Sequence, residues 1–323
     1  MCLRAPPESV KNMKPLKVSL LAGALALAGA LQAASINPPT ATPQNVPMTS
    51  QEKKNLDFIL KWWREVIYAG HLELAPGYQA ENYIQHNPNV PTGREGFVEF
   101  FKKISRPMNP IPATMANPPV VAGAKGDFVW LIFEQEKKLP RDPSRTYLDT
   151  SIDVLRIENG KVQEHWDSQM KMKGSGAVVT GVSPKPPMQW NTGKLSKEEL
   201  QTLELAKSEF KDMLQYAHLE LADKTMDAGY IQHNANFEQG REAFKRIMSS
   251  RPGRRPEDAK PIKDEWIDPP VLTLVNGPYC LMMMRRTDKD PDDPSRTYKW
   301  NHFNVIRVEN GLIKEHWDDF IVN

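Results

Sequence analysis

The sequence predicts an α+β protein built from two similar domains in tandem. Tyr-Ile-Gln-His-Asn at Tyr83–Asn87 returns 147 positions later, at Tyr230–Asn234. Glu-His-Trp-Asp at Glu164–Asp167 returns 151 positions later, at Glu315–Asp318. Within each repeat, helical spacing of apolar residues gives way to alternation with a period of two. A period of about 150 residues is the size of a domain, whereas solenoid units span roughly 20 to 50 residues, so we predict two copies of one fold.

The N-terminal segment, residues 1–35, is expected to be a secretory signal peptide. Lysines precede an uncharged run from Val18 to Ala30, and small residues follow up to Ser35. A membrane span needs about 20 apolar residues, so this run is short for one. We therefore expect cleavage, a periplasmic or secreted protein and no stable membrane association afterwards; an uncleaved anchor is the alternative. Residues 36–49 are predicted to form a disordered lead-in.

The overall composition is that of an ordinary globular protein. Charged residues make up 25% of the chain, hydrophobic residues 40%, and the formal net charge is +2. Such a small net charge gives no support to nucleic acid as a partner. The two cysteines provide no disulfide framework.

Each repeat is predicted to begin with a long helix. Apolar residues recur at steps of three and four over Leu56–Ile67 in the first repeat and Leu200–Leu214 in the second. Ser196 with Glu199 forms a capping box ahead of the second of these helices. Ser50 is a weaker cap for the first.

Two shorter helices are predicted to follow in each repeat. His-Leu-Glu-Leu-Ala, at His71 and His218, begins one of them. Gly-Arg-Glu, at Gly93 and Gly240, opens the other. The offset between the repeats grows from 147 to 151 after Gly240, so the second repeat carries a net insertion of four residues before its Pro-Pro motif at Pro269.

The rest of each repeat is predicted to be an antiparallel meander. In the first repeat, period-two alternation marks four strands, at 120–121, 128–133, 147–157 and 162–170. Asn159-Gly160 and Asn310-Gly311 are signals of type I′ hairpin turns. Helices followed by a meander indicate α+β domains in which helices cover one face of the sheet. The predicted domains are 50–173 and 195–323, joined by a flexible linker at 174–194.

The histidines supply the candidate site residues. Six of the seven fall at matched positions in the repeats, as the pairs His71 and His218, His86 and His233, and His165 and His316. The seventh, His302, aligns with Ser151. Strand alternation predicts that His165 shares a face with Asp167, while Val162, Glu164 and Trp166 share the other.

An acidic residue on the neighbouring strand completes this group. Asp153 stands between two apolar residues, and the hairpin register predicts that it lies opposite Trp166, beside His165 and Asp167. A bulge would change that register by one residue. In a dry cavity these side chains would form a carboxylate–imidazole group that moves a proton, with the pKa of the carboxyl raised by burial. Such a group can take a proton from a carbon next to a carbonyl, which leaves an enolate. An imidazole or tyrosine hydroxyl would hydrogen-bond the enolate oxygen.

Metal and cofactor chemistry have little support in the sequence. Three histidines and an aspartate per repeat would be enough ligands for a metal, but no His-x-His or His-x-x-x-His spacing occurs, so no metal site is predicted. The chain has no Gly-x-Ser-x-Gly elbow, phosphate-binding glycine loop or dinucleotide fingerprint. We therefore expect no cofactor.

Three motifs together resemble the SnoaL-like polyketide cyclase branch of the nuclear transport factor 2-like superfamily, over both repeats. They are Tyr-Ile-Gln-His-Asn-Pro, Gly-Arg-Glu, and Arg-Ile-Glu-Asn-Gly-Lys-Val-x-Glu-His-Trp-Asp. The resemblance implies cone-shaped domains, each with three helices on a curved antiparallel (mixed) sheet around an apolar cavity. It implies acid/base residues at pocket-facing positions, which here are His86, Asp153, His165 and Asp167, and in the second repeat His233, Asn304, His316 and Asp318. We further expect Tyr83, Trp130 and Tyr230 to line the ligand pockets.

The second repeat departs from the first at the proposed base. Asn304 stands where the first repeat has Asp153, and His302 stands where it has Ser151. An amide takes no proton at neutral pH, so either the first repeat alone is competent or the second uses His302 instead. The relatives pair through their sheets, and a linker of about 20 residues is long enough for the two repeats to form an internal pseudo-dimer.

Three functions remain open at this point. The first is a cofactor-free lyase, isomerase or cyclase acting on a small carbonyl compound, with Asp153 as base and His86, His165 and Asp167 orienting or donating. The second is non-catalytic binding of a small apolar ligand in the same pockets. The third is assembly through the sheet faces alone. Fold does not decide among them.

Overall fold

The computed structural model describes residues 46–176 and 182–319. The chain divides into two units, Met1–Gln32 and Ala33–Asn323, and everything below concerns the second. The predicted signal peptide lies outside the described residues, as do residues 36–45 of the predicted lead-in. Within the ranges described, no helix combines the length and the apolar character needed to cross a membrane.

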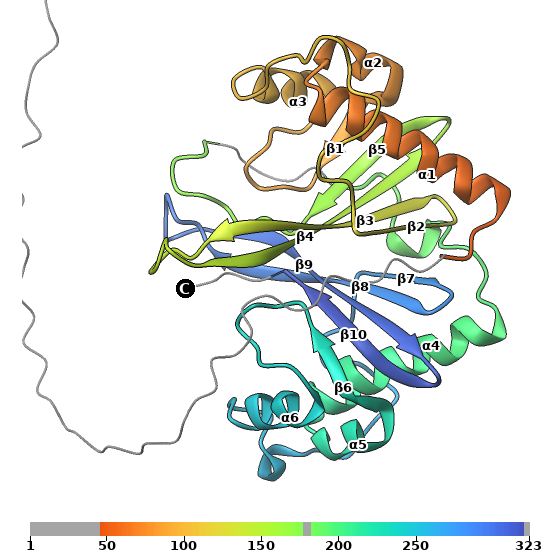
Figure 1. Cartoon of the computed structure of the whole chain (residues 1–323), viewed down its shortest axis with the longest axis vertical. Coiled ribbons are helices and arrows are strands. Elements are labelled where there is room, and N and C mark those ends of the chain that lie inside the picture. Colours follow the sequence, from red (N-terminus) through yellow and green to blue (C-terminus); the bar gives the residue numbers. More distant parts are fainter. Residues whose placement is uncertain (1–45, 177–181, 320–323) are drawn as a thin grey trace, which may run out of the picture. The chain divides into compact units, whose positions relative to one another are not determined.

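The first repeat contains one five-stranded mixed sheet with helices on one face (Figure 1). Its helices are α1 (Ser50–Trp62), η1 (Trp63–Tyr68), η2 (Leu72–Leu74), α2 (Ala75–Tyr78) and α3 (Arg94–Phe101). Its strands are β1 (Gln79–Gln85), β2 (Val121–Lys125), β3 (Phe128–Lys138), β4 (Thr146–Glu158) and β5 (Lys161–Asp167). The strand order is β1-β5-β4-β3-β2, with β1 parallel to β5 and the other neighbours antiparallel.

The second repeat has the same strand order, β6-β10-β9-β8-β7, with β6 parallel to β10. Its helices are α4 (Lys197–Lys207), η4 (Ser208–Met213), η5 (Leu219–Leu221), α5 (Ala222–Thr225) and α6 (Arg241–Ser249). Two short turns, η3 (Pro187–Gln189) and η6 (Pro256–Asp258), lie in connections. The strands of the second repeat are β6 (Met226–Gln232), β7 (Leu272–Asn276), β8 (Tyr279–Lys289), β9 (Thr297–Glu309) and β10 (Leu312–Asp318). The α+β prediction is confirmed.

The Tyr-Ile-Gln-His segment lies in a strand, so each sheet has five strands: this one and the four of the meander. Tyr83 lies in β1, whose partner β5 follows about 80 residues later in the chain. Local turn residues predict a hairpin, whereas two parallel strands are joined by a long crossover and no local residue predicts their pairing. The predicted hairpin turns are confirmed, because Asn159 and Gly160 both have positive φ, 53° and 67°.

Both long helices begin with a capping box. Ser196 and Glu199 cap α4 as predicted, whereas the cap of α1 is Thr49 with Glu52 and not Ser50. The Oγ atom of Ser196 accepts from the backbone N–H of Glu199 at 3.2 Å. Helix-end N–H groups have no partner within the helix, so such a bond stabilises the first turn.

We expect Ser196→Ala to lower the free energy of unfolding by about 1 kcal/mol, because it removes the cap acceptor. Thr49→Ala removes the matching cap from α1 and should cost a similar amount. Urea denaturation measures both. A change of more than about 3 kcal/mol for either variant would show that these side chains do more than cap.

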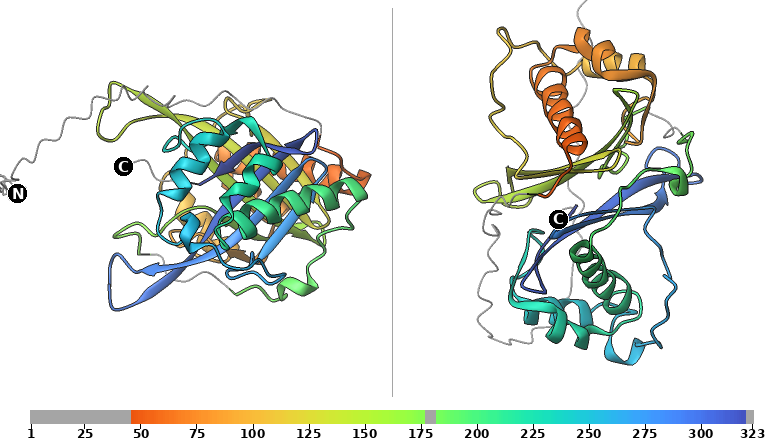
Figure 2. Two further views of the ribbon diagram at one scale, coloured as in Figure 1. Left: turned by 90° about the horizontal axis from the view of Figure 1, so that it is seen from below. Right: turned by 90° about the vertical axis from the view of Figure 1, so that its right-hand side faces the viewer.

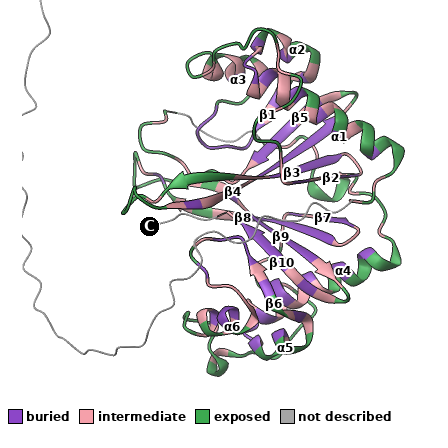
Figure 3. Ribbon diagram, in the orientation of Figure 1, coloured by how far each residue is buried: buried purple, intermediate pink, exposed green. Residues whose placement is uncertain are grey.

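A shared hydrophobic cluster joins the two sheets on the faces away from their helices (Figures 2 and 3). The first repeat contributes Trp130, Val154 and Trp166 among others, and the second contributes Tyr279 and Trp317. Trp130 Nε1 donates to Asn276 Oδ1 at 2.8 Å within this cluster. The expectation that Trp130 lines a ligand pocket is therefore corrected, because its position on β3 faces the other sheet.

A bulge in the last hairpin sets which side chains face the helices. Ile157 pairs with Val162, but Arg156 pairs with Glu164, so Gln163 is an extra residue on β5. Val162 consequently packs on the helix side with the first-repeat core. The predicted shared face of Val162, Glu164 and Trp166 is thus wrong for Val162. The same shift places Asp153 opposite Asp167 rather than Trp166.

Candidate functional site

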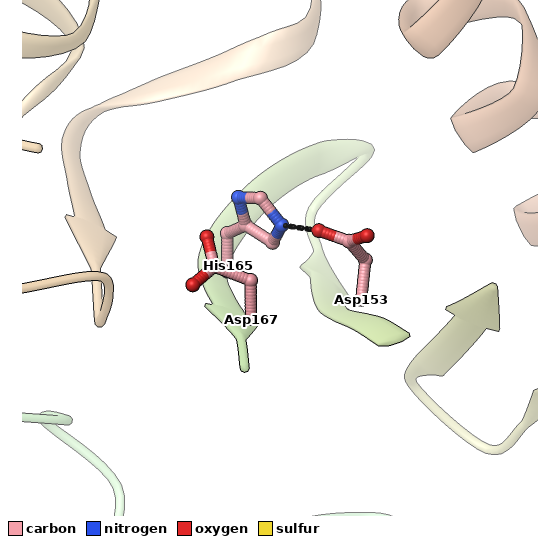
Figure 4. Close-up of side chains that lie close together, drawn as sticks. All are labelled: Asp153, His165 and Asp167. Atoms are coloured by element: carbon pink, nitrogen blue, oxygen red, sulfur yellow. Dashed lines mark hydrogen bonds and ion pairs between the residues drawn. The ribbon is translucent and has the colours of Figure 1, made fainter. Parts of the chain in front are cut away.

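The first repeat brings Asp153, His165 and Asp167 together on the helix side of the sheet (Figure 4). His165 Nε2 lies 2.8 Å from Asp153 Oδ1. Its Nδ1 lies 3.1 Å from Gln85 Nε2 and 3.2 Å from the Tyr83 hydroxyl. The Gln85 carbonyl oxygen accepts from the N–H of Asn87, which fixes the orientation of the amide. Gln85 therefore donates to Nδ1, and the proton of neutral His165 sits on Nε2, toward Asp153.

The charges of this group are mutually dependent. Burial raises the pKa of Asp167 to about 6, although His165 works against that rise. Burial alone would lower the pKa of His165, but the Asp153 carboxylate raises it above the ordinary value. Buried side chains with shifted pKa values are what is expected of acid/base residues.

Aromatic side chains cover the same group. Asp153 is 7% and His165 6% exposed. The rings of Trp62 and Trp63 meet His165 edge-on, at centroid distances of 6.3 and 6.1 Å. Trp63 also stacks on Phe133, at 4.9 Å. Both nitrogens of His165 have protein partners, so the ring has no free nitrogen to offer a ligand.

The Asp153, His165 and Asp167 set is also the one that could hold a metal ion among the residues the structure describes. Its ligand atoms lie within 4.8 Å of one another. Two carboxylates and one imidazole suit a divalent cation. Binding would require His165 to exchange its hydrogen bond with Asp153 for the metal, and the second repeat has an amide, Asn304, in place of Asp153.

The second repeat contains an open cavity of about 440 Å³ at the corresponding place. His302, Asn304, His316 and Asp318 all line it. Phe210 and Met284 of its wall stand where the first repeat has Trp63 and Phe133. A cavity of this size accommodates a small molecule.

His316 keeps a carboxylate partner despite the change to Asn304. Its Nε2 lies 3.1 Å from Asn304 Oδ1, and its Nδ1 lies 3.1 Å from Glu209 Oε1 and 2.9 Å from the Tyr230 hydroxyl. Glu209 belongs to η4 and stands where the first repeat has Trp62. Burial alone would lower the pKa of His316, but Glu209 and Asp318 raise it. Oxygen atoms lie near both nitrogens of His316, and Gln232 Nε2 also lies 3.3 Å from its Nδ1.

His302 forms a second dyad, with Asp319. Its Nδ1 lies 3.0 Å from Asp319 Oδ1, which also accepts from the N–H of Phe303 at 2.6 Å. No atom of residues 46–176 or 182–319 hydrogen-bonds its Nε2. Burial alone would lower the pKa of His302, but Asp319 and Asp318 raise it. This is the arrangement of a general base: a carboxylate orients one ring nitrogen and leaves the other free.

Asp318 completes the polar floor of the cavity. Its Oδ1 accepts from the side-chain amide of Asn234 at 2.8 Å. Burial raises the pKa of Asp318, while His316 and His302 lower it. A carboxyl group with a raised pKa can be protonated and donate a hydrogen bond to a ligand oxygen.

His86 and His233 do not lie with these groups, which corrects the expectation that they face the pockets. Each belongs to the side of the sheet that meets the other repeat. His86 stacks on Trp166 at 4.6 Å and contacts Glu164 at 3.0 Å; His233 stacks on Trp317 at 4.4 Å. Burial lowers the pKa of His86, although Glu164 works against that shift.

His86 and His233 differ in which residue of the opposite repeat lies near them. His233 Nδ1 lies 2.7 Å from Glu134 Oε1 of the first repeat. His86 is instead influenced by Arg285, the residue that aligns with Glu134. Burial alone would lower the pKa of His233, but Glu134 and Glu315 raise it. His233 thus contacts the other sheet, and neither histidine lines the second-repeat cavity.

Sequence reasoning missed four residues of the second-repeat site: Asp319, Arg251 and Arg254, which line the cavity, and Glu209, which contacts His316. A helical pattern hides Glu209, because it falls among residues expected to be core. Asp319 follows directly after the Glu-His-Trp-Asp motif, and its first-repeat counterpart is Ser168. The signal for the arginines was the longer connection of the second repeat, in which the chain reads Arg-Pro-Gly-Arg-Arg-Pro from Arg251 to Pro256.

Comparison with known proteins gives the following similarities. No protein-family model matches the chain, and no curated protein matches it. Among solved structures, IdmH from Streptomyces antibioticus, a candidate polyketide cyclase, is 19% identical over 35% of this chain and 90% of its own, with a TM-score of 0.26. A candidate SnoaL-like polyketide cyclase from Jannaschia sp. CCS1 is 12% identical over 38% of this chain and 90% of its own, with a TM-score of 0.27.

A candidate polyketide cyclase from Bacillus cereus ATCC 10987 is 19% identical over 41% of this chain and 86% of its own, with a TM-score of 0.27. At these identities and scores the likeness carries no conclusion about function. The function must be inferred from the site itself.

Proposed function

We propose that this chain is a tandem duplication of a SnoaL-like domain and that its two copies form an internal pseudo-dimer. The matched motifs, the equal strand orders and the shared hydrophobic cluster support this proposal. The pattern of residues 1–35 further supports export, which mass spectrometry of the mature N-terminus would test.

The proposed activity is cofactor-free proton transfer on a small carbonyl compound in the second-repeat cavity. The observation that carries it is the His302–Asp319 pair beside a cavity of about 440 Å³, in which none of the residues that the structure describes hydrogen-bonds His302 Nε2. The first-repeat group has acid/base character too, but aromatic rings pack against it and both nitrogens of His165 are occupied.

In the proposed reaction, His302 Nε2 takes a proton from the carbon next to the carbonyl. The C–H bond breaks, its electron pair moves to the carbonyl oxygen, and Asp319 stabilises the imidazolium that forms. Asp318 in its protonated form donates a hydrogen bond to the enolate oxygen. Return of the proton from His302 to another carbon of the enolate system gives an isomer.

Binding without chemistry is the second candidate function. It is favoured by the occupied nitrogens of His316 and by the apolar wall of the cavity, which includes Phe210, Phe237 and Met284. In that case the polar groups would orient a ligand and nothing more.

Exchange of solvent deuterium separates the two functions. The protein would be mixed in D₂O with a panel of small aryl and alkyl ketones and keto acids, and loss of the α-proton followed by NMR. We expect exchange above the buffer rate for at least one compound. Ligands that bind but never exchange would contradict the proposed activity and leave binding alone.

We expect Asp153→Asn to exchange the ketone at the wild-type rate, because Asp153 belongs to the other repeat. The rate is measured in the same NMR assay, with circular dichroism as a control for folding. Loss of exchange in a folded Asp153→Asn protein would move the active site to the first repeat.

A further inference from the structure

The second-repeat cavity carries two arginines whose charges are not neutralised by a neighbouring carboxylate. Arg251, Arg254 and Arg286 all line it. Arg286 pairs with Asp268. Arg254 is partly buried and donates its Nη1 to Met248 Sδ at 3.0 Å. Arg251 lies over the ring of Phe237, 5.1 Å from its centroid. In the part of the chain that the structure describes, neither Arg251 nor Arg254 forms an ion pair.

The acidic side chains of the cavity are engaged elsewhere. Asp268 holds Arg286, Asp319 holds His302, and Asp318 accepts from Asn234. Burial lowers the pKa of Arg254, and the charges of Arg251 and Arg286 lower it further. These positive groups therefore repel one another in the free protein, and a bound anion would relieve that repulsion.

A guanidinium group with unused donors is suited to an oxyanion. It has five N–H donors in a planar fork, which match two oxygens of a carboxylate or phosphate. Arg254 uses one of these donors, on a weak sulfur acceptor. The remaining donors face no protein acceptor within the described ranges.

Part of the cavity wall is apolar. Phe210, Leu214, Phe237, Met248 and Met284 line it alongside the polar groups. A ligand that fits both parts has an anionic group at one end and an apolar body. The volume of about 440 Å³ is in the range of small-molecule sites.

We propose that the second-repeat cavity takes a small organic anion, whose carboxylate or phosphate group binds Arg251 and Arg254 while its apolar body contacts Phe237 and Met284. This inference rests on the proposed function, since it names the class of compound that reaches His302. The anion site belongs to the second repeat alone. The segment that carries Arg254 is four residues longer there, and Arg286 aligns with Gln135.

Calorimetry on the full chain tests the charge preference. Three probes share an aromatic body: 3-phenylpropanoate, its neutral amide 3-phenylpropanamide, and phenyl phosphate. We expect at least one of the two anions to bind about ten-fold tighter than the amide, since hydrogen bonds to a charged group are stronger than those to a neutral one. Whichever anion binds tighter identifies the source of the oxyanion.

The Arg254→Gln variant is expected to lose about ten-fold in affinity for the preferred anion and to bind the amide as the wild type does. Arg106→Gln is the matched control, because Arg106 stands in the Ser-Arg-Pro sequence of the first repeat and should leave all three affinities unchanged. Circular dichroism verifies the fold of both variants.

Three outcomes would overturn the inference: equal affinity for anion and amide, a preference that survives substitution of both Arg251 and Arg254, or no binding of either anion at millimolar concentration. The outcome is separable from that of the proposed function. Anion preference without deuterium exchange of any ketone would contradict the proposed proton transfer and support the proposed ligand class. Exchange of neutral ketones without anion preference would support the proton transfer and contradict the ligand class.

Discussion

The His302→Gln variant is expected to exchange the α-proton of a ketone substrate about 10²- to 10⁴-fold more slowly than the wild-type protein. Glutamine keeps the approximate length of the side chain but has no basic nitrogen. The loss should fall on kcat, because the ring contributes to proton removal rather than to holding the ligand. NMR in D₂O at saturating and limiting ketone measures the two parameters separately.

The pH profile gives a second measure of the same base. Only neutral imidazole accepts a proton, so exchange should rise with pH through the pKa of His302, which Asp319 and Asp318 raise above its usual value of about 6.5. Asp319→Asn removes the nearest of these charges and should move the rising limb to lower pH. His218→Gln is the control, because that histidine pairs with Glu220 away from the cavity. Wild-type exchange in His302→Gln would show that another group is the base.

The Glu164→Gln variant is expected to lose about 3–5 kcal/mol of unfolding free energy, the usual cost of breaking a buried ion pair on one side. Glu164 is fully buried and lies 2.7 Å from Arg156 Nε and 3.0 Å from His86 Nε2. The linker adds Ser183, whose hydroxyl donates to Glu164 at 2.9 Å. Neutralising the carboxylate leaves the buried Arg156 charge without its main partner. Urea unfolding at pH 7 measures the loss.

The control is Glu158→Gln, which removes another carboxylate from the same arginine. Glu158 lies 2.7 Å from Arg156 Nη1, but its side chain is 32% exposed. Water can replace that contact, so the expected loss is under about 1 kcal/mol. Similar losses for the two variants would contradict the role assigned to burial.

Acid should weaken the wild-type protein through the same residue. His86 and Arg156 hold the pKa of Glu164 below its usual value, although burial works against them. Its contribution to stability is present above the unfolded pKa of about 4.3 and is lost as the pH falls through the lower folded value. The Glu164→Gln variant should lack this part of the acid dependence.

Features that depend on near neighbours were predictable. The capping box at Ser196 and Glu199 and the hairpin turns at Asn159 and Asn310 follow from contacts over a few residues. The change from helical to period-two spacing gave the α+β class for the same reason. Asp153, His165 and Asp167 were expected to meet, and the structure places them together.

Which face of the sheet each site residue occupies was harder to predict from the sequence. One extra residue at Gln163 changes the register of the hairpin, and no local signal marks it. His86 follows β1 directly, and its orientation depends on the parallel pairing with β5. Its assignment to the pocket failed because that pairing joins residues far apart in the chain.

By itself, the sequence determined the repeat, the class of each element and the presence of an imidazole–carboxylate group, because each rests on short-range spacing and residue chemistry. Only the tertiary structure decided which group borders an open cavity. Trp62 and Trp63 cover His165, whereas the second repeat has Glu209 and Phe210 at those positions and its cavity remains open. Glu209 reaches His316 from a helix about 100 residues away in the chain. Packing and charge pairing between such distant segments depend on how the whole domain fills space, and local patterns do not encode that.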